Sequence, residues 1–360
     1  MSWIPIVFLA LLASAGLVAC CAFSSPRYTG PKTDHFDGVR FHNQVRGHEK
    51  GVSDMLKWAS QRDPGEWHPR DSDPKPPPPR SVSEGIRITF INHSTVLLQL
   101  DGLNVLTDPI WSERASPVSF AGPKRVHAPG LQIEDLPPVD VILISHNHYD
   151  HLDVPTLRQL VGRHRPRIFT GLGNSVFLKR KKIHGSRDMD WWQSILLRPD
   201  VRLTFVPAQH FSSRGLCDHY ATLWGGFVIE APSGTVFFAG DTGLGPHFDQ
   251  IRTRFGPPDL AILPIGAYKP NWFMSFFHLS PAEAIEAHRR LGARHSVGVH
   301  HSTFPLADDG QDDPALDLAR AVEEAGLAKD AFWLLDFGQG RSIHKRPDLK
   351  CGPAGHRMAS

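Results

Sequence analysis

Apolar and polar residues are distributed unevenly along the chain. Residues 4–19, IPIVFLALLASAGLVA, form one uncharged apolar run, whereas residues 22–82 are mostly polar and include the proline-rich stretch DPKPPPPR at 73–80. From about Ile86 onward, short apolar runs recur between turn residues. The pattern predicts a polar arm with a Pro-rich linker over 22–82, a globular domain over 83–345, and a disordered tail over 346–360. Residues 1–80 are expected to lie outside the core of this domain.

The apolar runs within the domain are short enough to be β-strands. The segment 86–109 predicts β-strands, with Asp101-Gly102 as a two-residue hairpin turn. Further strands are predicted at 139–145, 202–207, 225–231, 235–240, 259–265 and 296–300. A helix is predicted to begin with a capping box at Ser280 and to end at Gly292, and another to run from Asp313 to Gly326. A short helix is also possible at 57–63 in the arm.

The first 21 residues have the features of a targeting or anchoring segment. The apolar run fits the hydrophobic part of a signal peptide and is short for a spanning helix. It ends in LVAC, 17–20, which resembles a bacterial lipobox and predicts cleavage before Cys20 and lipidation of that residue. Because MSW at the N-terminus has no Lys or Arg, an uncleaved anchor is the alternative. The prediction is a membrane-associated protein, lipid-anchored at Cys20 in a bacterial envelope, with a peripheral cytoplasmic protein as the alternative.

Composition excludes some classes of function. The formal net charge is only +2, so a nucleic-acid partner is not expected. The basic run KRKK at 179–182 is interpreted as a solvated helix face, with contact to anionic lipid as the alternative. The four cysteines lie at 20, 21, 217 and 351, a spacing that predicts neither a disulfide framework nor a cysteine-based zinc site. The sequence gives no indication of the oligomeric state.

One stretch, ISHNHYDHLD at 144–153, concentrates ionisable side chains directly after a predicted buried strand. Residues two apart point the same way at the end of a strand, so His146 and His148 can reach one metal ion. Asp150 and His151 follow as the chain turns and can face a second metal. The pattern HxHxDH after a strand is specific enough to predict a metal site.

Other predicted strands also end in residues that bind metals. His210, Asp241 and His300 each follow a strand, and each signal alone is weak. Asp108 also ends a strand, where a plain turn aspartate and a support for a ligand histidine are equally good interpretations.

Together these residues resemble the ordered ligand motifs of the metallo-β-lactamase superfamily. The resemblance implies an α+β fold, an αββα sandwich of two packed β-sheets with outer helices and metals at one edge. It implies that His146, His148 and His210 bind one zinc, that Asp150, His151 and His300 bind the other, and that Asp241 bridges both. The same ligand types also suit iron or manganese. In HHSTF, 300–304, two adjacent histidines compete for one ligand position, and the offset to TF favours His300.

Several longer segments narrow the resemblance to one branch. TDPIWSERASPVSFAGPKR, LPPVDVILISHNHYDHLD, DWWQS, AGDTG and RFGPPDLAILPIGAYKPNWFM are similar to the N-acylphosphatidylethanolamine-hydrolysing phospholipase D family. The similarity covers about residues 85–345. It implies a dinuclear zinc enzyme that cleaves a phosphodiester by a metal-bridged hydroxide, giving phosphatidic acid and an N-acylethanolamine. An amphiphilic phospholipid is then the expected partner.

The resemblance also implies roles for individual residues. Asp241 fixes the distance between the metals, and Asp150 both ligates and steers the proton of the hydroxide. Tyr149 and His278 are implied at the substrate, where His278 donates to a phosphate oxygen or protonates the leaving group. The apolar stretch NWFMSFF, 271–277, is either core filling or an acyl-chain groove with Trp272 and Phe273 on its wall.

Two alternatives remain open. The chain could be a metal-dependent lactonase or another small-molecule hydrolase of the same fold, in which case 271–277 would be core. It could also be a non-catalytic envelope lipoprotein. The complete set of seven ligands argues against the last, because packing alone does not require buried carboxylates beside histidines.

Overall fold

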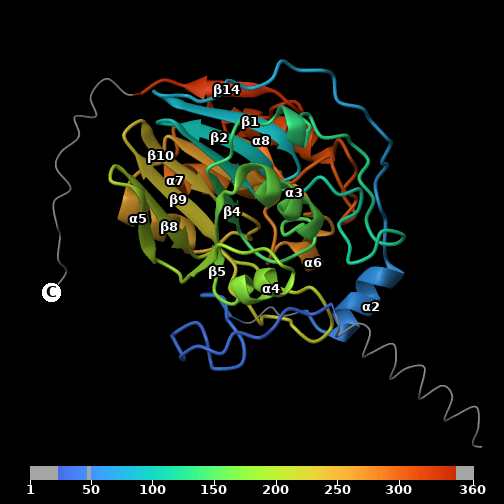
Figure 1. Ribbon diagram of the computed structural model, residues 1–360. Coiled ribbons are helices and arrows are strands. Elements are labelled where there is room, and N and C mark those ends of the chain that lie inside the picture. The colour runs from blue at the N-terminus through green and yellow to red at the C-terminus, as the bar shows by residue number, and fades with distance from the viewer. Residues whose placement is uncertain (1–22, 47–49, 346–360) are drawn as a thin grey trace, which may run out of the picture.

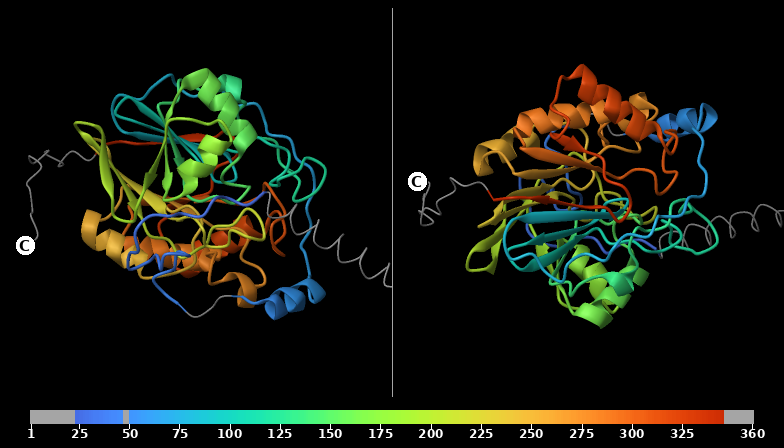
Figure 2. Two further views of the ribbon diagram at one scale, coloured as in Figure 1. Left: turned by 60° about the horizontal axis from the view of Figure 1, so that its bottom comes forward. Right: turned by 90° about the horizontal axis from the view of Figure 1, so that it is seen from above.

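The computed structural model describes residues 23–46 and 50–345, which fold around two packed β-sheets. Figure 2 shows the layers: α3 (Val154–His164) and α4 (Asn174–Arg180) cover the outer face of one sheet, and α5 (His247–Phe255), α7 (Pro281–Leu291) and α8 (Asp313–Glu324) cover the outer face of the other. The predicted sandwich of two sheets between outer helices is confirmed (Figure 1).

The first sheet has seven strands in the order β14-β1-β2-β3-β4-β5-β6. Strands β14 to β3 pair antiparallel, and β3 to β6 pair parallel. The strands are β1 (Ile86–Asn92), β2 (Thr95–Leu100), β3 (Leu103–Thr107), β4 (Val141–Ile144), β5 (Arg167–Gly171), β6 (Ser186–Met189) and β14 (Gly340–Ile343).

The second sheet also has seven strands, in the order β13-β12-β11-β10-β9-β8-β7. Strands β10 to β13 pair parallel, and β7 to β10 pair antiparallel. The strands are β7 (Ser194–Arg198), β8 (Val201–Val206), β9 (Gly226–Ala231), β10 (Gly234–Phe238), β11 (Leu260–Pro264), β12 (His295–Val299) and β13 (Phe332–Trp333).

Except for α2, which precedes β1, the helices follow strands that pair parallel, as crossover connections require. They are α2 (Val52–Ser60), α3 (Val154–His164), α4 (Asn174–Arg180), α5 (His247–Phe255), α6 (Asn271–Met274), α7 (Pro281–Leu291) and α8 (Asp313–Glu324), with a 3-10 turn at Ile133–Asp135. One buried cluster fills the space between the sheets. A second lies under α5, α7 and α8, and a third under α3 and α4.

The clearest local signals in the sequence are confirmed. Asp101 and Gly102 both have positive φ, 47° and 77°, and join β2 to β3 as the two-residue hairpin turn. At the start of α7, Ser280 and Glu283 form the predicted capping box, and Gly292 ends the helix in the left-handed conformation. Strands β5, β6, β7, β13 and β14 were not predicted, because their apolar runs are brief and flanked by polar or charged residues.

The expectation that the arm lies outside the core is wrong for its first part. Phe36 and Phe41 are buried in the cluster between the sheets, with ring centroids 4.5 Å apart. The backbone N–H of Phe41 donates to the carbonyl of Tyr220 at 2.9 Å. Hydropathy could not reveal this, because each phenylalanine stands alone between charged residues and its burial depends on a segment about 180 residues away. The domain boundary at residue 82 stays a prediction.

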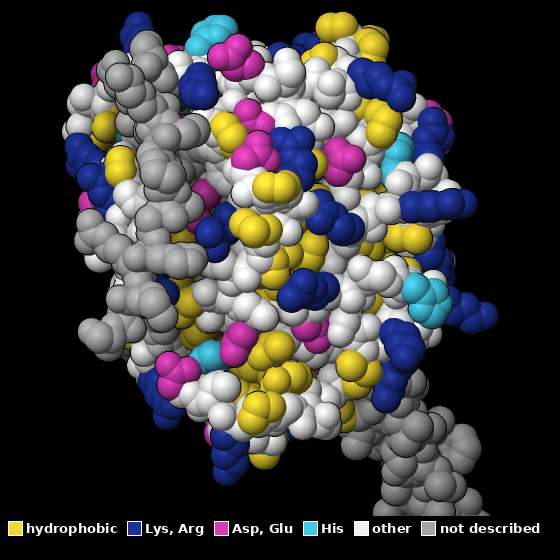
Figure 3. Space-filling model, turned by 60° about the vertical axis from the view of Figure 1, so that its left-hand side comes forward, with side chains coloured by type: hydrophobic (Ala, Val, Ile, Leu, Met, Phe, Trp, Pro, Cys, Tyr) yellow, Lys and Arg dark blue, Asp and Glu magenta, His cyan; other side chains and the backbone are white. Residues whose placement is uncertain are grey.

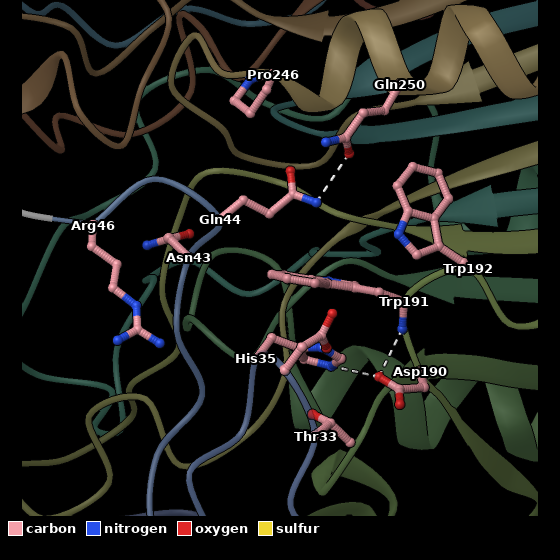
Figure 4. Close-up of a pocket in the computed structure, with 11 residues that line it drawn as sticks. Thr33, His35, Asn43, Gln44, Arg46, Asp190, Trp191, Trp192, Pro246 and Gln250 are labelled. Atoms are coloured by element: carbon pink, nitrogen blue, oxygen red, sulfur yellow. Dashed lines mark hydrogen bonds and ion pairs between the residues drawn. The ribbon is translucent and has the colours of Figure 1, made fainter.

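The arm and the domain together line a cavity of about 670 Å³ (Figure 4). On one wall, His35 is 2.7 Å from a carboxylate oxygen of Asp190, between β6 and β7. On another, the side-chain amide of Gln44 donates to Gln250 of α5 at 3.0 Å. The arm is therefore attached to the domain by polar as well as apolar contacts.

We predict that Phe41→Ala lowers the free energy of unfolding by about 3–5 kcal/mol, because a fully buried aromatic side chain leaves a cavity. Urea unfolding of the full chain measures this change. Phe120→Ala is the matched control, since Phe120 is 81% exposed and its removal is expected to change stability by less than about 0.5 kcal/mol. Equal effects of the two substitutions would show that the arm does not contribute to the core.

Three predictions from the sequence lie partly or wholly outside the described residues. These are the targeting segment at 1–21 with its lipobox Cys20, the first residue of the arm, and the tail at 346–360. Within the described part of the chain, no helix has the length and apolar character needed to span a bilayer. Cys217 is disulfide-bonded, which the cysteine spacing did not predict.

Candidate metal centre

The predicted ligand residues meet at one edge of the sandwich. His146 and His148 follow β4, His210 follows β8, Asp241 follows β10 and His300 follows β12. These strands belong to both sheets, and all five side chains are at least partly buried. Strand ends from two sheets therefore surround one small polar space.

Three histidines form the first group. Nε2 of His146 lies 2.8 Å from Nδ1 of His148, and that atom lies 3.3 Å from Nε2 of His210. Three imidazole nitrogens that converge in this way can bind one metal ion. This is the trio that the superfamily resemblance implied for the first zinc.

The second group is built around the carboxylate of Asp150. Its Oδ2 atom lies 3.1 Å from Nε2 of His151, 3.3 Å from Nε2 of His300 and 2.9 Å from Nε2 of His93. All four side chains are buried. The group contains the three residues implied for the second zinc. It also contains His93, which was not predicted from the sequence.

Asp241 lies between the two groups. Its Oδ2 atom is 3.1 Å from Nε2 of both His151 and His300, and 3.8 Å and 4.0 Å from Nε2 of His210 and His146. One carboxylate oxygen thus approaches nitrogens of both groups. A bridging ligand requires this position.

Hydrogen bonds to the far side of three rings set their orientation. Nδ1 of His210 donates to the carbonyl of Phe277 at 2.9 Å, and Nδ1 of His151 donates to Oδ2 of Asp108 at 2.7 Å. Nδ1 of His146 lies 2.9 Å from Oγ of Ser145, whose hydroxyl donates to Asp108. When such a ring is neutral and its proton is on Nδ1, its Nε2 presents a lone pair to the centre.

Asp108 supports two ligand histidines from a fully buried position. Besides His151, it accepts hydrogen bonds from the backbone N–H and the hydroxyl of Ser145, at 2.7 Å and 2.6 Å. Of the two interpretations of Asp108, this geometry favours support of ligand histidines over a plain turn residue.

Charge is unevenly distributed over the centre. Burial lowers the pKa of His148 and of His210 to about 3, so both rings are neutral. Burial also opposes charge on His300, but the Asp241 and Asp150 carboxylates outweigh it and raise its pKa to about 9. The pKa of His151 is raised well above its usual range for the same reasons. Cation binding would replace these two protons, because metal ligands bind in their deprotonated form.

The donor set suits a divalent metal. Buried imidazole and carboxylate ligands are those that zinc, iron and manganese take in proteins. Within the described residues, Oδ1 of Asp241 is buried without a hydrogen-bond partner, as is Nδ1 of His278. Buried polar atoms usually have partners, and here a bound cation and its ligands would supply them.

His93, which follows β1 in the motif INHST, was not predicted from the sequence as part of the metal centre. Nε2 of His93 is 2.9 Å from Asp150, while Nδ1 has no hydrogen-bond partner. Burial lowers the pKa of His93 to about 3, so its neutral ring carries its one N–H on Nε2 and donates it to the carboxylate. The available signal was a histidine directly after a buried strand, the same signal that identified His210 and His300.

We predict that His93→Ala lowers the affinity for zinc by about ten-fold, because Asp150 loses the donor that orients it. Titration against a chromophoric chelator measures this affinity. His93→Gln, which can supply an N–H, is expected to recover part of the loss. Unchanged affinity in His93→Ala would mean that Asp150 is held by His151 and His300 alone.

The four residues predicted at the substrate lie in different surroundings. Nδ1 of His278 is 3.9 Å from Oδ2 of Asp241, so His278 borders the centre. Tyr149 instead packs against Arg214, whose guanidinium carbon lies 3.9 Å from the centroid of the Tyr149 ring. Phe273 stacks on Trp58 of the arm at 4.9 Å.

Trp272 lines a cavity of about 440 Å³. The other lining residues include Gln209, the neighbour of His210 in the chain, and the apolar side chains of Val45, Leu244 and Phe276. Trp272 is 38% exposed, and Nζ of Lys57 lies 4.6 Å from its ring centroid. Of the stretch 271–277, Trp272 thus faces a cavity, while Phe273 packs against the arm.

A buried histidine that is not a predicted metal ligand contacts the loop that carries Asp241, and this loop in turn contacts the loop that carries His210. Oγ1 of Thr242, next to Asp241, accepts from the N–H of Gln209 at 2.9 Å and lies 3.1 Å from Nε2 of His247. Burial lowers the pKa of His247 to about 3, with Arg290 adding to the effect.

Since the folded pKa of His247 lies below its unfolded value of 6.5, stability is lost as the pH falls from 6.5 toward 3. We predict that the wild type loses about 3 kcal/mol more between pH 7 and pH 4 than His247→Gln, which keeps a donor but does not titrate. Urea unfolding of both proteins at the two pH values measures the difference. Equal losses would mean that His247 becomes protonated without cost.

Comparison with known proteins agrees with this geometry. A family model described as a beta-lactamase superfamily domain matches residues 103–301. The chain belongs to the beta-lactamase superfamily. It has the metallo-β-lactamase fold, with a buried cluster of histidine and aspartate able to bind metal.

Two relatives and one solved structure show which proteins this chain resembles. An N-acyl-phosphatidylethanolamine-hydrolyzing phospholipase D of Caenorhabditis elegans is 40% identical over 233 residues, which cover 62% of this chain and 65% of that protein. A UPF0173 metal-dependent hydrolase of Methanopyrus kandleri is 30% identical over 246 residues, covering 67% of this chain and 94% of that protein. An isothiocyanate hydrolase from Delia radicum gut bacteria superposes with a TM-score of 0.56 at 20% identity, over 72% of this chain and 99% of that chain, which shows the shared fold.

Proposed function

We propose that this superfamily hydrolase binds two zinc ions and cleaves the phosphodiester of an N-acylphosphatidylethanolamine or a similar amphiphile. The observation that carries the proposal is the position of Asp241, whose Oδ2 lies 3.1–4.0 Å from nitrogens of both histidine groups. The similarity to the phospholipase D of Caenorhabditis elegans supports the substrate class.

The proposed ligands divide as the geometry groups them. His146, His148 and His210 would hold one ion, Asp150, His151 and His300 the other, and Asp241 would bind both. When bound, the zinc ions lower the pKa of water to near neutrality and offset charge on the phosphoryl oxygens. Asp150 is positioned to accept the proton of the attacking water, because its carboxylate lies in the second group.

His278 is the proposed contact to the phosphoryl oxygens. Burial lowers its pKa to about 3, partly offset by Asp241, so the ring is neutral. A neutral imidazole can donate one N–H to an oxygen, which favours hydrogen bonding over protonation of the leaving group. The side chain is 13% exposed, so it can be reached from outside the centre.

The cavity beside Trp272 is the proposed site for part of an acyl chain. Its apolar side chains, Leu244, Phe276 and Trp272, would cover methylene groups at about 25 cal/mol per Å² of buried surface. Lys50 lines the same cavity and donates to the carbonyl of Trp272 at 2.8 Å, which brings a positive charge to the cavity.

The test is lipid turnover by the zinc-loaded full chain. N-acylphosphatidylethanolamine in mixed micelles is the substrate, and mass spectrometry follows phosphatidic acid. Phosphatidic acid that forms with the wild type and not with His148→Ala supports the proposal. Hydrolysis of a generic phosphodiester or a lactone without turnover of the lipid would contradict the substrate and leave the metal site in place.

A second comparison tests the acyl-chain cavity. Trp272→Ala is expected to raise KM for the long-chain lipid about ten-fold with little change for a short-chain analogue, because only the long chain reaches the cavity. Leu316→Ala on α8 is the matched control, since Leu316 is 66% exposed and does not line the cavity. Equal effects on both substrates would place the acyl chain elsewhere.

A further inference from the structure

One segment of the chain carries an unbalanced positive charge. From Val154 to Arg187 there are nine Lys and Arg and no Asp or Glu. The whole chain has 39 Lys and Arg and 37 Asp and Glu, so the other residues hold 30 of the first kind against 37 of the second. The small net charge of the protein therefore conceals a strongly basic segment within a chain that is otherwise acidic.

This segment forms α3, β5, α4 and the start of β6, so its two helices cover the outer face of the first sheet (Figure 2). In Figure 3 the Lys and Arg side chains gather along the right-hand edge, which is the side of Figure 1 nearest the viewer, where α3 and α4 lie. Few acidic side chains lie among them. The exposed members are Arg158, Arg163, Arg165, Arg167, Lys179, Arg180, Lys182 and Arg187, which we call the basic face.

The charges of the basic face are not neutralised by the protein. Among the described residues, none of its members forms an ion pair with a carboxylate. Arg158, Arg163 and Arg167 donate to backbone carbonyls instead. Asp188, the nearest acid in the chain, uses both oxygens to accept from the N–H groups of Gly173 and Ser175. A surface of like charges costs free energy unless an external partner supplies the opposite charge.

Apolar side chains adjoin the basic face. A cavity of about 240 Å³ is lined by Phe23, Phe177 and Pro117 together with Arg158, Lys181 and Arg214. Phe23 is 38% exposed, and Val176 on α4 is 47% exposed. A purely polyanionic partner would not bury such apolar side chains, whereas the interfacial region of a bilayer accommodates both apolar and basic side chains.

The position of Phe23 links this surface to the N-terminal segment. Phe23 is the first described residue and lines the cavity beside Arg158 and Lys181. The apolar run predicted to target the membrane ends at residue 19, four residues earlier. An anchor at Cys20 would therefore hold this face of the domain within a few residues' length of the bilayer.

We propose that the basic face of α3 and α4 docks on the surface of a membrane that contains anionic phospholipid. The chain segment before Phe23 would bring the domain to the bilayer, and the basic face would fix its orientation there. The proposal concerns only how the domain lies on a membrane, so it does not depend on the substrate of the metal centre.

The test compares the full chain on vesicles of phosphatidylcholine alone and on vesicles that also contain phosphatidylglycerol. Each Lys or Arg near an anionic surface changes the partition coefficient about five-fold. The wild type is expected to bind the anionic vesicles more tightly, and added salt to reduce the difference. Lys179→Gln with Arg180→Gln is expected to weaken binding to the anionic vesicles about 25-fold, with no change on neutral vesicles.

Two further double variants test whether the effect depends on the position of the removed charges. Arg165→Gln with Arg187→Gln removes two charges from other parts of the basic face and is expected to have the same effect. Arg294→Gln with Lys329→Gln removes two exposed charges outside the basic face and is expected to have none. Thermal unfolding checks that each variant is folded.

Three results would overturn the proposal. Equal binding of the wild type to both kinds of vesicle would show that the face does not recognise anionic lipid. Equal weakening by all three double variants would show a general effect of net charge. Retention on heparin or duplex DNA without preference for anionic vesicles would assign the face to a soluble polyanion instead.

Discussion

Replacing Asp241 by asparagine is expected to reduce both metal content and hydrolysis more than about 100-fold. Loss of a partner that only orients a ligand costs about 10–100-fold, and Asp241 is proposed as a direct ligand of two ions. Its Oδ2 is 3.1 Å from Nε2 of both His151 and His300, so asparagine would also remove the negative charge that those two rings face. Elemental analysis of the purified protein and a hydrolysis assay measure the two quantities.

Asp249→Asn is the matched control for this substitution. It makes the same change of charge on α5, where the carboxylate is exposed, and is expected to leave both quantities unaltered. His148→Ala removes a proposed ligand of the first ion only and is likewise expected to lower metal content and hydrolysis together. Full activity in Asp241→Asn would mean that Asp241 is not a ligand.

The second large effect is expected from Asp108→Asn, which should lower zinc affinity about 10–100-fold. The Asp108 carboxylate accepts from Nδ1 of His151 and from the N–H and hydroxyl of Ser145. An asparagine amide would direct N–H groups at one of these donors and release the ring or the loop it holds. Competition with a chromophoric chelator measures zinc affinity, and thermal unfolding of the metal-free protein reports any general loss of stability.

Asp140→Asn separates this effect from a change of charge near β4. Asp140 lies at the other end of that strand, where its Oδ2 accepts from the N–H of Asn104 at 2.9 Å. This variant is expected to keep the zinc affinity of the wild type. If Asp108→Asn also kept it, the ligand histidines would be oriented by the remaining backbone contacts, such as that of His210 with Phe277.

The arm connects the fold to the centre in a way that the sequence did not indicate. Asn43 donates from its side-chain amide to the carbonyl of His210 and accepts from the N–H of the same residue, at 2.8 Å and 3.0 Å. A residue in the polar arm thus holds the backbone of a proposed ligand. Since side-chain amides are common on surfaces, nothing in the local sequence distinguishes Asn43 from its exposed neighbour Gln44.

The sequence by itself determined the local elements and the positions of the strand-end ligands. Asp101-Gly102 can adopt the positive φ angles that a two-residue hairpin needs, and Ser280 with Glu283 satisfies the first N–H groups of α7. Both effects act within a few residues, so they are readable in the chain. The same holds for HxHxDH, because residues at the end of a strand alternate in direction whatever lies around them.

Only the tertiary structure decided which distant residues complete the centre and which surfaces remain open. His93 joins Asp150 because β1 and β4 end at the same edge of a sheet, and Phe36 and Phe41 are buried because the arm crosses the gap between the sheets. The exposure of the basic face also depends on packing, since α3 and α4 cover the outer face of the first sheet and, among the described residues, its Lys and Arg side chains form no ion pair with a carboxylate. Burial, hydrogen bonding and charge pairing depend on neighbours remote in the sequence, and the three-dimensional fold is what selects them.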